Sequence, residues 1–265
     1  MSGRMNTMRL LLGTVGLLAM GSVAPALAAD LGARPYAKAP AMMVAVYDWS
    51  GFYIGANGGG GWSSKCWNVT NNAGAIVAPA AAEGCNNATG GVVGGQIGYR
   101  WQAGTWVFGV EGQGDWANLK GSNSSVFPAL AGATNQSKVN ALGLVTGQVG
   151  YAWNNVLWFV KGGAAVASDK YIGLNPVTGV AFDRSSETRW GGAVGTGVEF
   201  GFASNWSAGV EYDHMFMGNR TNTFLATGAT APVGTLTRTD SIGQDTDMVT
   251  ARINYRWGGP VVAKY

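Results

Sequence analysis

The chain has 265 residues, of which only 12% are charged, about half the share found in an ordinary soluble domain. It contains 43 glycines and 11 tryptophans, and its formal net charge at pH 7 is +3. No run of 18 or more apolar residues follows the N-terminal segment, which excludes a transmembrane helix there. This composition favours a transmembrane β-barrel over a secreted β-sandwich.

The first 28 residues have the three parts of a secretory signal peptide. Arg4 and Arg9 give a positive start, Leu10–Val23 is apolar, and Ala26–Ala28 is a small-x-small cleavage site. A short membrane anchor is the alternative, but the apolar stretch is too short to span a bilayer. Cleavage removes two arginines and no acid, so the mature net charge falls from +3 to +1 and gives no indication of nucleic-acid binding.

Residues 29–48 contain two prolines and many alanines without alternation, which predicts an extended N-terminal segment. It either hangs free or lies against one mouth of a barrel. The rest of the chain holds segments in which apolar and polar residues alternate, as they do in Trp106–Trp116. A period of two places successive side chains on opposite faces of a strand. The strands predicted in this way are 49–63, 91–101, 106–116, 140–153, 156–167, 189–202, 206–216 and 247–257.

The connections between these strands alternate in length. Tight turns are predicted at 102–105, 154–155 and 203–205, and long loops at 64–88, 119–138, 168–188 and 217–246. Bacterial outer-membrane barrels have an even number of strands, short periplasmic turns and longer external loops, whereas a soluble sandwich does not alternate so regularly. The prediction is an all-β, eight-stranded antiparallel up-and-down transmembrane β-barrel over 49–257, with four long external loops, short periplasmic turns and a tail at 258–265.

The apolar faces of these strands end in tryptophan on the side of the short turns. Aromatic residues gather at both membrane–water interfaces of outer-membrane barrels. The pattern therefore predicts a periplasmic aromatic girdle, formed by Trp101, Trp106, Trp153, Trp158, Trp206 and Trp257.

Several stretches resemble one protein family. Asp48–Gly59, Gln148–Trp153, Gly197–Ser207 and the ending Ile253–Tyr265 resemble the small outer-membrane β-barrel proteins of alphaproteobacteria. These are porin-family surface antigens with a domain similar to the eight-strand domain of outer-membrane protein A. The resemblance covers about 49–265 and implies a place in the outer membrane, with general surface or envelope roles; some relatives are reported as haem binders or immunogenic surface proteins. Phe is usual at the end of the last strand, where this chain has Trp257.

The polar faces of the predicted strands carry five acids and four bases. An unpaired charge in a narrow lumen costs several kcal/mol, so pairing is expected, with Glu111 and Asp115 paired to Arg100 and to bases across the lumen. A carboxylate cluster is also a candidate active site, but side chains nearly fill an eight-strand barrel, which favours an internal network over catalysis or a diffusion pore. The predicted network is Arg100, Glu111, Asp115, Lys161, Glu199, Glu211, Asp213, Arg252 and Arg256.

Cysteine and histidine are scarce in this chain. Cys66 and Cys85 lie in the first predicted external loop, where an oxidising compartment favours a disulfide over two reduced thiols. His214 is the single histidine, so the usual Cys/His zinc site is not available. His214 belongs to the residues of its strand that are predicted to face lipid. It is therefore either an axial haem ligand at the rim or an interfacial histidine without a partner.

The functional prediction is a structural, surface-exposed outer-membrane protein that contributes to envelope integrity and surface interactions. No catalytic residue, cofactor or metal site is predicted, and the protein is not expected to be an enzyme. The expected partners are the outer-membrane lipid bilayer, the barrel assembly machinery during insertion, and external ligands that meet the loops, but not nucleic acid. The alternatives are a small-solute porin and a haem-binding outer-membrane protein.

Overall fold

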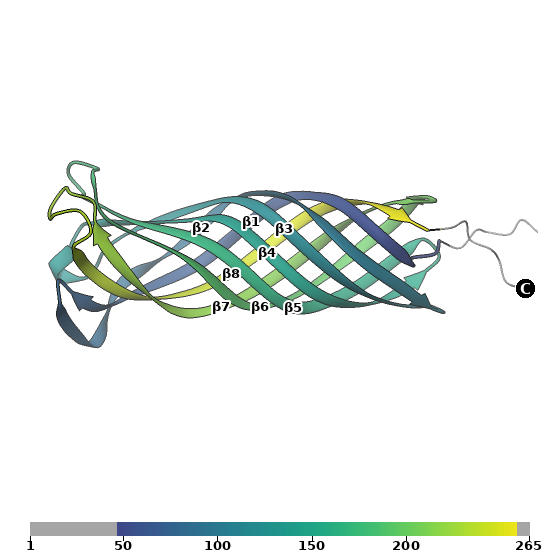
Figure 1. The fold of residues 1–265 in the computed structure, drawn as a ribbon, viewed down its shortest axis with the longest axis horizontal. Helices are drawn as coiled ribbons and strands as arrows, with labels where there is room; N and C mark the ends of the chain where they lie inside the picture. The colour runs from purple at the N-terminus through teal and green to yellow at the C-terminus, as the bar shows by residue number, and fades with distance from the viewer. Residues whose placement is uncertain (1–46, 259–265) are drawn as a thin grey trace, which may run out of the picture. The chain divides into compact units, whose positions relative to one another are not determined.

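The computed structural model describes residues 47–258, which form one closed barrel of eight antiparallel strands (Figure 1). Each strand pairs with the next along the chain, and the last pairs with the first, so the predicted up-and-down fold is confirmed. The signal peptide, most of segment 29–48 and most of the tail lie outside the described residues. The strands are β1 (Gly51–Asn72), β2 (Ala75–Ala103), β3 (Trp106–Ser124), β4 (Thr134–Trp153), β5 (Val156–Leu174), β6 (Ala181–Ala203), β7 (Trp206–Ala226) and β8 (Leu236–Trp257).

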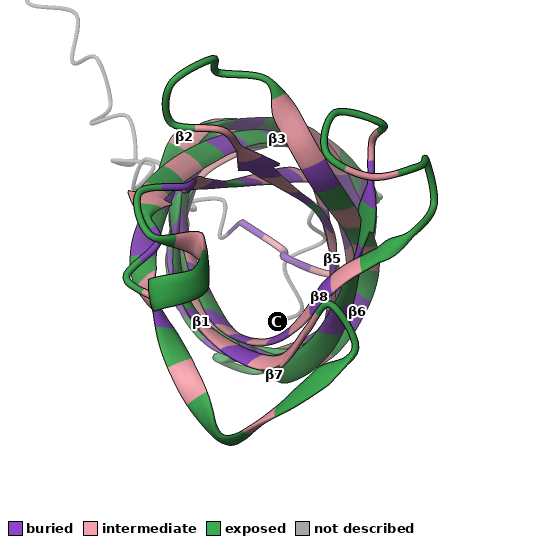
Figure 2. Cartoon of the chain, turned by 90° about the vertical axis from the view of Figure 1, so that its left-hand side faces the viewer, coloured by how far each residue is buried: buried purple, intermediate pink, exposed green. Residues whose placement is uncertain are grey.

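Along every strand, buried and exposed residues alternate, as the bands around the ring in Figure 2 show. In β3, Val107 and Glu111 point into the barrel and are buried, whereas Trp106 and Val110 point outward and are exposed. Large apolar side chains therefore cover much of the outside, while the inside holds most of the buried charges. This is the reverse of a soluble barrel and fits a wall that meets lipid.

Two-residue turns close one end of the barrel, which we call the short-turn end. They lie at 104–105, 154–155 and 204–205, close to the predicted positions. Gly104 and Asn154 have positive φ angles of 64° and 54°, the backbone conformation that tight hairpin turns require. The first residue of β1 and the last of β8 also lie at this end (Figure 1).

The opposite end, which we call the hairpin end, differs from the prediction. Most of each predicted long loop is strand: β1 and β2 continue to a two-residue tip at 73–74, and the other tips are 125–133, 175–180 and 227–235. The second tip holds the short 3₁₀ helix η1 (Pro128–Leu130). The strands have 19 to 29 residues, whereas about 9 to 11 suffice to cross a bilayer. The long connections are thus projecting hairpins rather than irregular loops.

The first hairpin is cross-linked as predicted. Cys66 and Cys85 are direct partners in the β1–β2 register, and their sulfur atoms are 2.06 Å apart. The predicted disulfide is confirmed. Within residues 47–258, no helix is long and apolar enough to cross a membrane.

Candidate functional site

The lumen is filled by successive layers of buried side chains, and β5 crosses most of them. From the short-turn end, its buried inward residues run from apolar (Leu157, Phe159) to charged (Lys161), again apolar (Ala165, Ala167), charged (Asp169) and aromatic (Tyr171). Inward residues occur at every second position of a strand, so each inward residue lies at its own level along the barrel axis.

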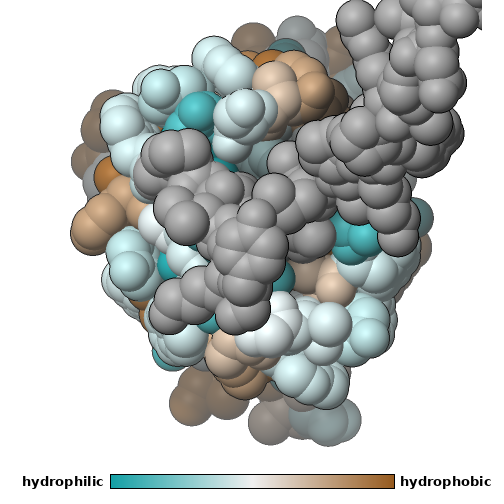
Figure 3. All heavy atoms as spheres, turned by 90° about the vertical axis from the view of Figure 1, so that its right-hand side faces the viewer, coloured by the Kyte–Doolittle hydropathy of each residue, from teal (hydrophilic) through white to brown (hydrophobic). Residues whose placement is uncertain are grey.

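The mouth plug closes the short-turn end. Tyr47 and Trp49, from the segment just before β1, are buried in the mouth, and the Trp49 amide donates to Gln102 Oε1 at 2.9 Å. Arg256 donates to the Ser50 carbonyl at 2.8 Å, and its guanidinium lies 5.2 Å from the Tyr47 ring centre. Residues 47–50 therefore lie in the mouth, at the end viewed in Figure 3, where pale polar residues line the rim and hydrophobic residues lie farther out. The cluster is Tyr47, Trp49, Val107, Ala152, Leu157 and Phe159.

Above the plug lies the lower charge layer, an ion-pair network that joins four strands. Arg252 bonds to Glu111 at 2.7 Å and also to Glu211. The Lys161 ammonium is 2.6 Å from Glu211, 3.1 Å from Asp213 and 3.5 Å from Glu111. All five side chains are at most 1% exposed. Two bases thus hold three acids, and the attraction is strong because water is excluded.

Arg100 belongs to a second ion pair in the same layer. Its guanidinium is 2.9 Å from Glu199 on β6, which also accepts hydrogen bonds from Ser207 and Asn254. The expected pairing of Arg100 with Glu111 is wrong, since the two residues are two positions apart in the β2–β3 register. The long arginine side chain reaches across the lumen instead of along the wall.

The nine predicted network residues are all buried, and the structure brings seven of them into ion pairs. Two of the nine have no ion pair with another described residue. Asp115 lies higher, where it accepts a hydrogen bond from Gln113 Nε2 at 3.0 Å. Arg256 binds backbone carbonyls at the mouth. The pairing expected for Asp115 and Arg256 is therefore not observed.

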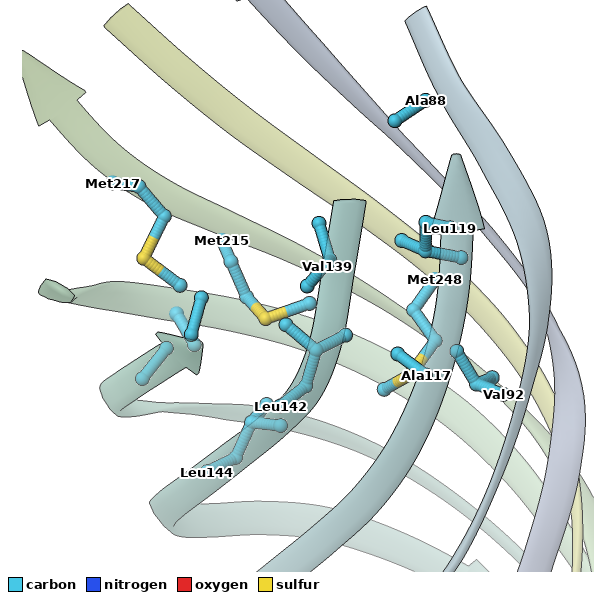
Figure 4. Close-up of a cluster of buried hydrophobic side chains, with 13 residues drawn as sticks. Ala88, Val92, Ala117, Leu119, Val139, Leu142, Leu144, Met215, Met217 and Met248 are labelled. Atoms are coloured by element: carbon cyan, nitrogen blue, oxygen red, sulfur yellow. The ribbon is translucent and has the colours of Figure 1, made fainter. Parts of the chain in front are cut away.

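An apolar layer follows, at inward positions that were predicted to be polar. On β7, the inward residues change from Glu211 and Asp213 to Met215 and Met217. Figure 4 shows these methionines pointing toward side chains of other strands inside the barrel. The members are Ala88, Val92, Ala117, Leu119, Val139, Leu142, Leu144, Ala165, Ala167, Ala193, Met215, Met217 and Met248. A hydrophobic constriction of this kind opposes a continuous water column, because it offers water no hydrogen-bond partner.

Nearer the hairpin end are an upper charge layer and an aromatic layer. In the first, Lys65 pairs with Asp169, and Arg189 lies 3.8 Å from the same carboxylate and pairs with Glu187. In the second, the Trp67 ring centre is 5.2 Å from Tyr171 and 5.6 Å from Phe224, with Ile242 alongside. Apart from Arg189, the first residue of a predicted strand, both layers are built by parts of the strands that were predicted to be loops.

The hairpin cluster is the last layer and lies beyond the level of the exposed tryptophans Trp62, Trp116 and Trp190. Arg238 pairs with Glu83, with Asp183 at 3.0 Å and with Asp240 at 3.6 Å, and donates to Asn135 Oδ1 at 3.0 Å. One base faces three acids, so full ionisation would leave an uncompensated negative charge. Burial, reinforced by the neighbouring Glu83, raises the pKa of Asp240 to about 8. Burial also raises the pKa of the Asp183 carboxyl, although Arg238 opposes that shift.

None of the residues in the upper layers was predicted to be part of a site. A signal was present, because Lys65, Trp67 and Val69 follow one another at every second position, as do Arg238, Asp240 and Ile242 in β8. The neighbouring positions are polar rather than apolar, so this alternation resembled a loop.

His214 lies on the outer face of β7 and has a partner. Its Nδ1 is 2.7 Å from Asp247 Oδ1, which also accepts the Tyr212 hydroxyl at 2.6 Å. The Phe216 ring centre lies 4.3 Å from the imidazole centre. The interpretation of His214 as a histidine without a partner is therefore wrong, because a carboxylate orients the ring.

The outward apolar residues form a belt around the barrel, which we call the apolar belt. The six predicted girdle tryptophans lie at its short-turn edge and are 41–53% exposed. At its other edge, Trp62, Trp116 and Trp190 are exposed in the same way. From Trp106 to Trp116 the strand rises about 33 Å, which a tilt near 45° reduces to about 23 Å. That height is close to the apolar band of an outer-membrane barrel.

Comparisons with known proteins agree with this architecture. The family model described as "Outer membrane protein beta-barrel domain" matches residues 14–256. The 31 kDa outer-membrane immunogenic proteins of Brucella melitensis and Brucella suis are each 29% identical over 204 residues, which cover 74% of this chain and 82% of theirs.

Two solved structures show the same kind of fold. The outer membrane protein OprG of Pseudomonas aeruginosa has a TM-score of 0.51 at 12% identity, over 82% of this chain and 100% of its own. The outer membrane protease OmpT of Escherichia coli has a TM-score of 0.50 at 10% identity, over 78% of this chain and 97% of its own. At these identities, the likeness concerns the fold alone.

Proposed function

The chain belongs to the outer-membrane β-barrel family, and from that premise we propose that it is a structural, surface-exposed protein of the envelope. In this proposal the barrel is closed to solutes, contributes to envelope integrity, and meets external partners through its four hairpins. The lipid bilayer of the outer membrane surrounds the apolar belt. We also propose that the protein catalyses no reaction.

The filled lumen is the observation that carries the proposal. A general porin needs a continuous water-filled path, and in this barrel such a path would have to pass the mouth plug, the lower charge layer and the apolar layer. Opening the lower charge layer would separate buried ion pairs, and wetting the apolar layer would expose the methionines and leucines packed there. Conduction would require both changes, and each costs free energy, so we expect the folded barrel not to conduct.

The outer surface supports the rest of the proposal. Short turns are periplasmic in outer-membrane barrels, so in this proposal the hairpins lie outside the cell and the periplasmic interface is lined by the girdle tryptophans Trp101, Trp106, Trp153, Trp158, Trp206 and Trp257. The β1–β2 tip lies 11 residues beyond Trp62, which corresponds to a projection of about 25 Å for a strand tilted near 45°. The alternating apolar residues of β8, ending in Trp257, are the segment that we propose the barrel assembly machinery recognises.

Planar-bilayer conductance of the refolded protein tests the closed lumen. We expect no stable current steps from wild type, with folding verified by the shift in gel migration on boiling. The companion variant Leu142→Ser/Met215→Ser/Met248→Ser makes the apolar layer polar while the mouth plug and the lower ion pairs stay unchanged; we expect it to remain closed as well, because two of the three barriers are still in place. Stable unit steps from wild type, reproduced by swelling of liposomes in a pentose, would show that the barrel is a pore.

A further inference from the structure

Three lysines form one row on the outside of the barrel beyond the apolar belt. Lys120 on β3 is the direct register partner of Lys138 on β4, which in turn is the partner of Lys170 on β5. Their strand neighbours Leu119 and Asp169 are fully buried, so the lysines point away from the lumen. Neighbouring strands are about 4.8 Å apart, so the row is about 10 Å long.

This arrangement is unfavourable for the isolated protein, because like charges directly opposite each other on a sheet repel. Within residues 47–258, none of the three ammonium groups has an ion pair or a side-chain hydrogen bond. Arg184 on β6, opposite Ile172, extends the positive surface by one strand. No described residue neutralises the positive charge of the row, so the row is available to an anionic ligand from outside the chain.

The row lines a groove of about 380 Å³ on the barrel surface. Besides the lysines, Ser122 and Gln136 contribute polar groups, and Ile172 contributes an apolar side chain. The groove therefore combines three positive charges with hydrogen-bonding groups in one concave strip. Lysine binds phosphate as a point charge, and several lysines together bind it with greater affinity.

The row lies at the outer margin of the head-group region of a bilayer. Lys120 lies four residues beyond Trp116, the exposed tryptophan at the outer edge of the belt. On a tilted strand this is about 9 Å above the edge, at the outer margin of the polar region, which is about 5–8 Å deep on each side of the hydrocarbon core; the long lysine side chains can reach down into that region. Below the row, Trp116 and Val166 offer apolar surface to acyl chains. The outward acids Asp245 and Asp247 lie on β8, which is not adjacent to β3, β4 or β5 in the ring.

We propose that the lysine row binds the phosphate groups of the glycolipid in the outer leaflet of the membrane. The three ammonium groups stand on flexible side chains that can reach those phosphates, and the exposed apolar wall beneath, with Trp116, can accept the acyl chains of the same molecule. Bound lipid removes the repulsion among Lys120, Lys138 and Lys170 and ties the wall of β3–β5 to its surroundings. This inference rests on the proposed orientation, with the hairpins outside the cell, but not on whether the lumen is closed.

The test uses the full mature chain, refolded in detergent and transferred to phosphatidylcholine vesicles. The probe is bisphosphorylated lipid A, added at increasing fractions, and its retention on the immobilised protein gives an apparent affinity. The variant Lys120→Gln/Lys138→Gln/Lys170→Gln removes the charge, and the corresponding triple arginine variant keeps it. Arg220→Gln is the matched control, because Arg220 is an exposed base on β7 away from the row.

We expect the triple glutamine variant to bind lipid A about 100-fold more weakly, since each lysine near an anionic surface contributes about fivefold. The triple arginine variant and Arg220→Gln should stay within about threefold of wild type. Dephosphorylated lipid A should bind wild type no better than the intact lipid binds the glutamine variant. Lys138→Gln alone, which lowers affinity about fivefold, gives the same information if the triple variant does not fold.

Three outcomes would overturn the proposal. One is retention of lipid A by the folded glutamine variant, or by Lys138→Gln, equal to that of wild type. Another is binding that does not change when the phosphates are removed from lipid A. The third is displacement of lipid A by micromolar inorganic phosphate or by a soluble polyanion such as heparin, because the row would then bind a free anion or a soluble partner rather than a lipid.

Discussion

Replacing Arg252 with Met tests whether the lower charge layer stabilises the barrel. Arg252 is the base that joins Glu111 on β3 to Glu211 on β7, and its side chain is 1% exposed. Its loss leaves both carboxylates, together with Asp213, facing the single ammonium of Lys161. Removing one partner of a buried ion pair costs about 3–5 kcal/mol, and Met fills much of the vacated volume. We therefore expect the free energy of unfolding to fall by about 3–5 kcal/mol.

Urea unfolding of the barrel in lipid vesicles measures this change, followed by tryptophan fluorescence and by migration of unboiled samples. The double variant Arg252→Met/Glu211→Gln removes one of the stranded acids with the base, so its loss should be about 2 kcal/mol smaller than the sum of the two single losses. Arg220→Met, an exposed arginine on the same barrel, should change stability by less than about 0.5 kcal/mol. A loss below about 1 kcal/mol for Arg252→Met would refute the reasoning, because the ion pairs of the lower charge layer would then contribute little to the free energy of unfolding.

Three further predictions concern the wall and the hairpins. Gly98→Ala should lower the free energy of unfolding by about 1–3 kcal/mol in the same assay, because a Cβ atom there would lie 2.5 Å from the buried Tyr53 ring; Gly112→Ala, which meets nothing within 4 Å, should be nearly neutral. Cys66→Ser removes the disulfide and should cost about 2–3 kcal/mol, with faster hydrogen exchange in 64–88 and unchanged exchange at the short-turn end. Asp240 keeps its proton up to about pH 8 when folded but only below about pH 4 when unfolded, so the folded state binds more protons between these values. Opening of the hairpin end, measured by hydrogen exchange corrected for its intrinsic pH dependence, should therefore increase from pH 5 to pH 9, and Asp240→Asn should flatten that increase.

The fold could be predicted from the sequence because lipid imposes a simple pattern on the wall. Within the apolar belt, each outward residue meets hydrocarbon and each inward residue meets the lumen, so neighbours such as Val110 and Glu111 differ sharply in polarity. That contrast located all eight strands at the level of the membrane. Above the belt, the outward residues meet water or head groups, as Lys120 and Lys138 do, and the contrast disappears although the strands continue.

The contents of the lumen were less accessible to sequence analysis. Alternation shows which side chains point inward, but not which of them meet across the barrel. Arg100 and Glu199 are 99 positions apart, and their contact depends on the stagger of β2 against β6 around a closed ring. The apolar layer was missed for a related reason, because inward positions were expected to be polar. Met215 and Met248 lie two register positions apart on the paired strands β7 and β8, but only the closed barrel brings them together with Leu142 of β4.

The layers near the hairpin end bear on how an outside partner would meet this protein. Trp67, Tyr171 and Phe224 pack together from β1, β5 and β7, and Arg238 joins β8 to acids on β2 and β6. The hairpins therefore share a buried core of their own, beyond the level at which lipid supports the wall. Loop surfaces that lack such a core are usually mobile. With strands continuing to tips as short as 73–74, much of the exposed surface is strand with a fixed register, so an external ligand or antibody that binds here meets a largely preformed surface.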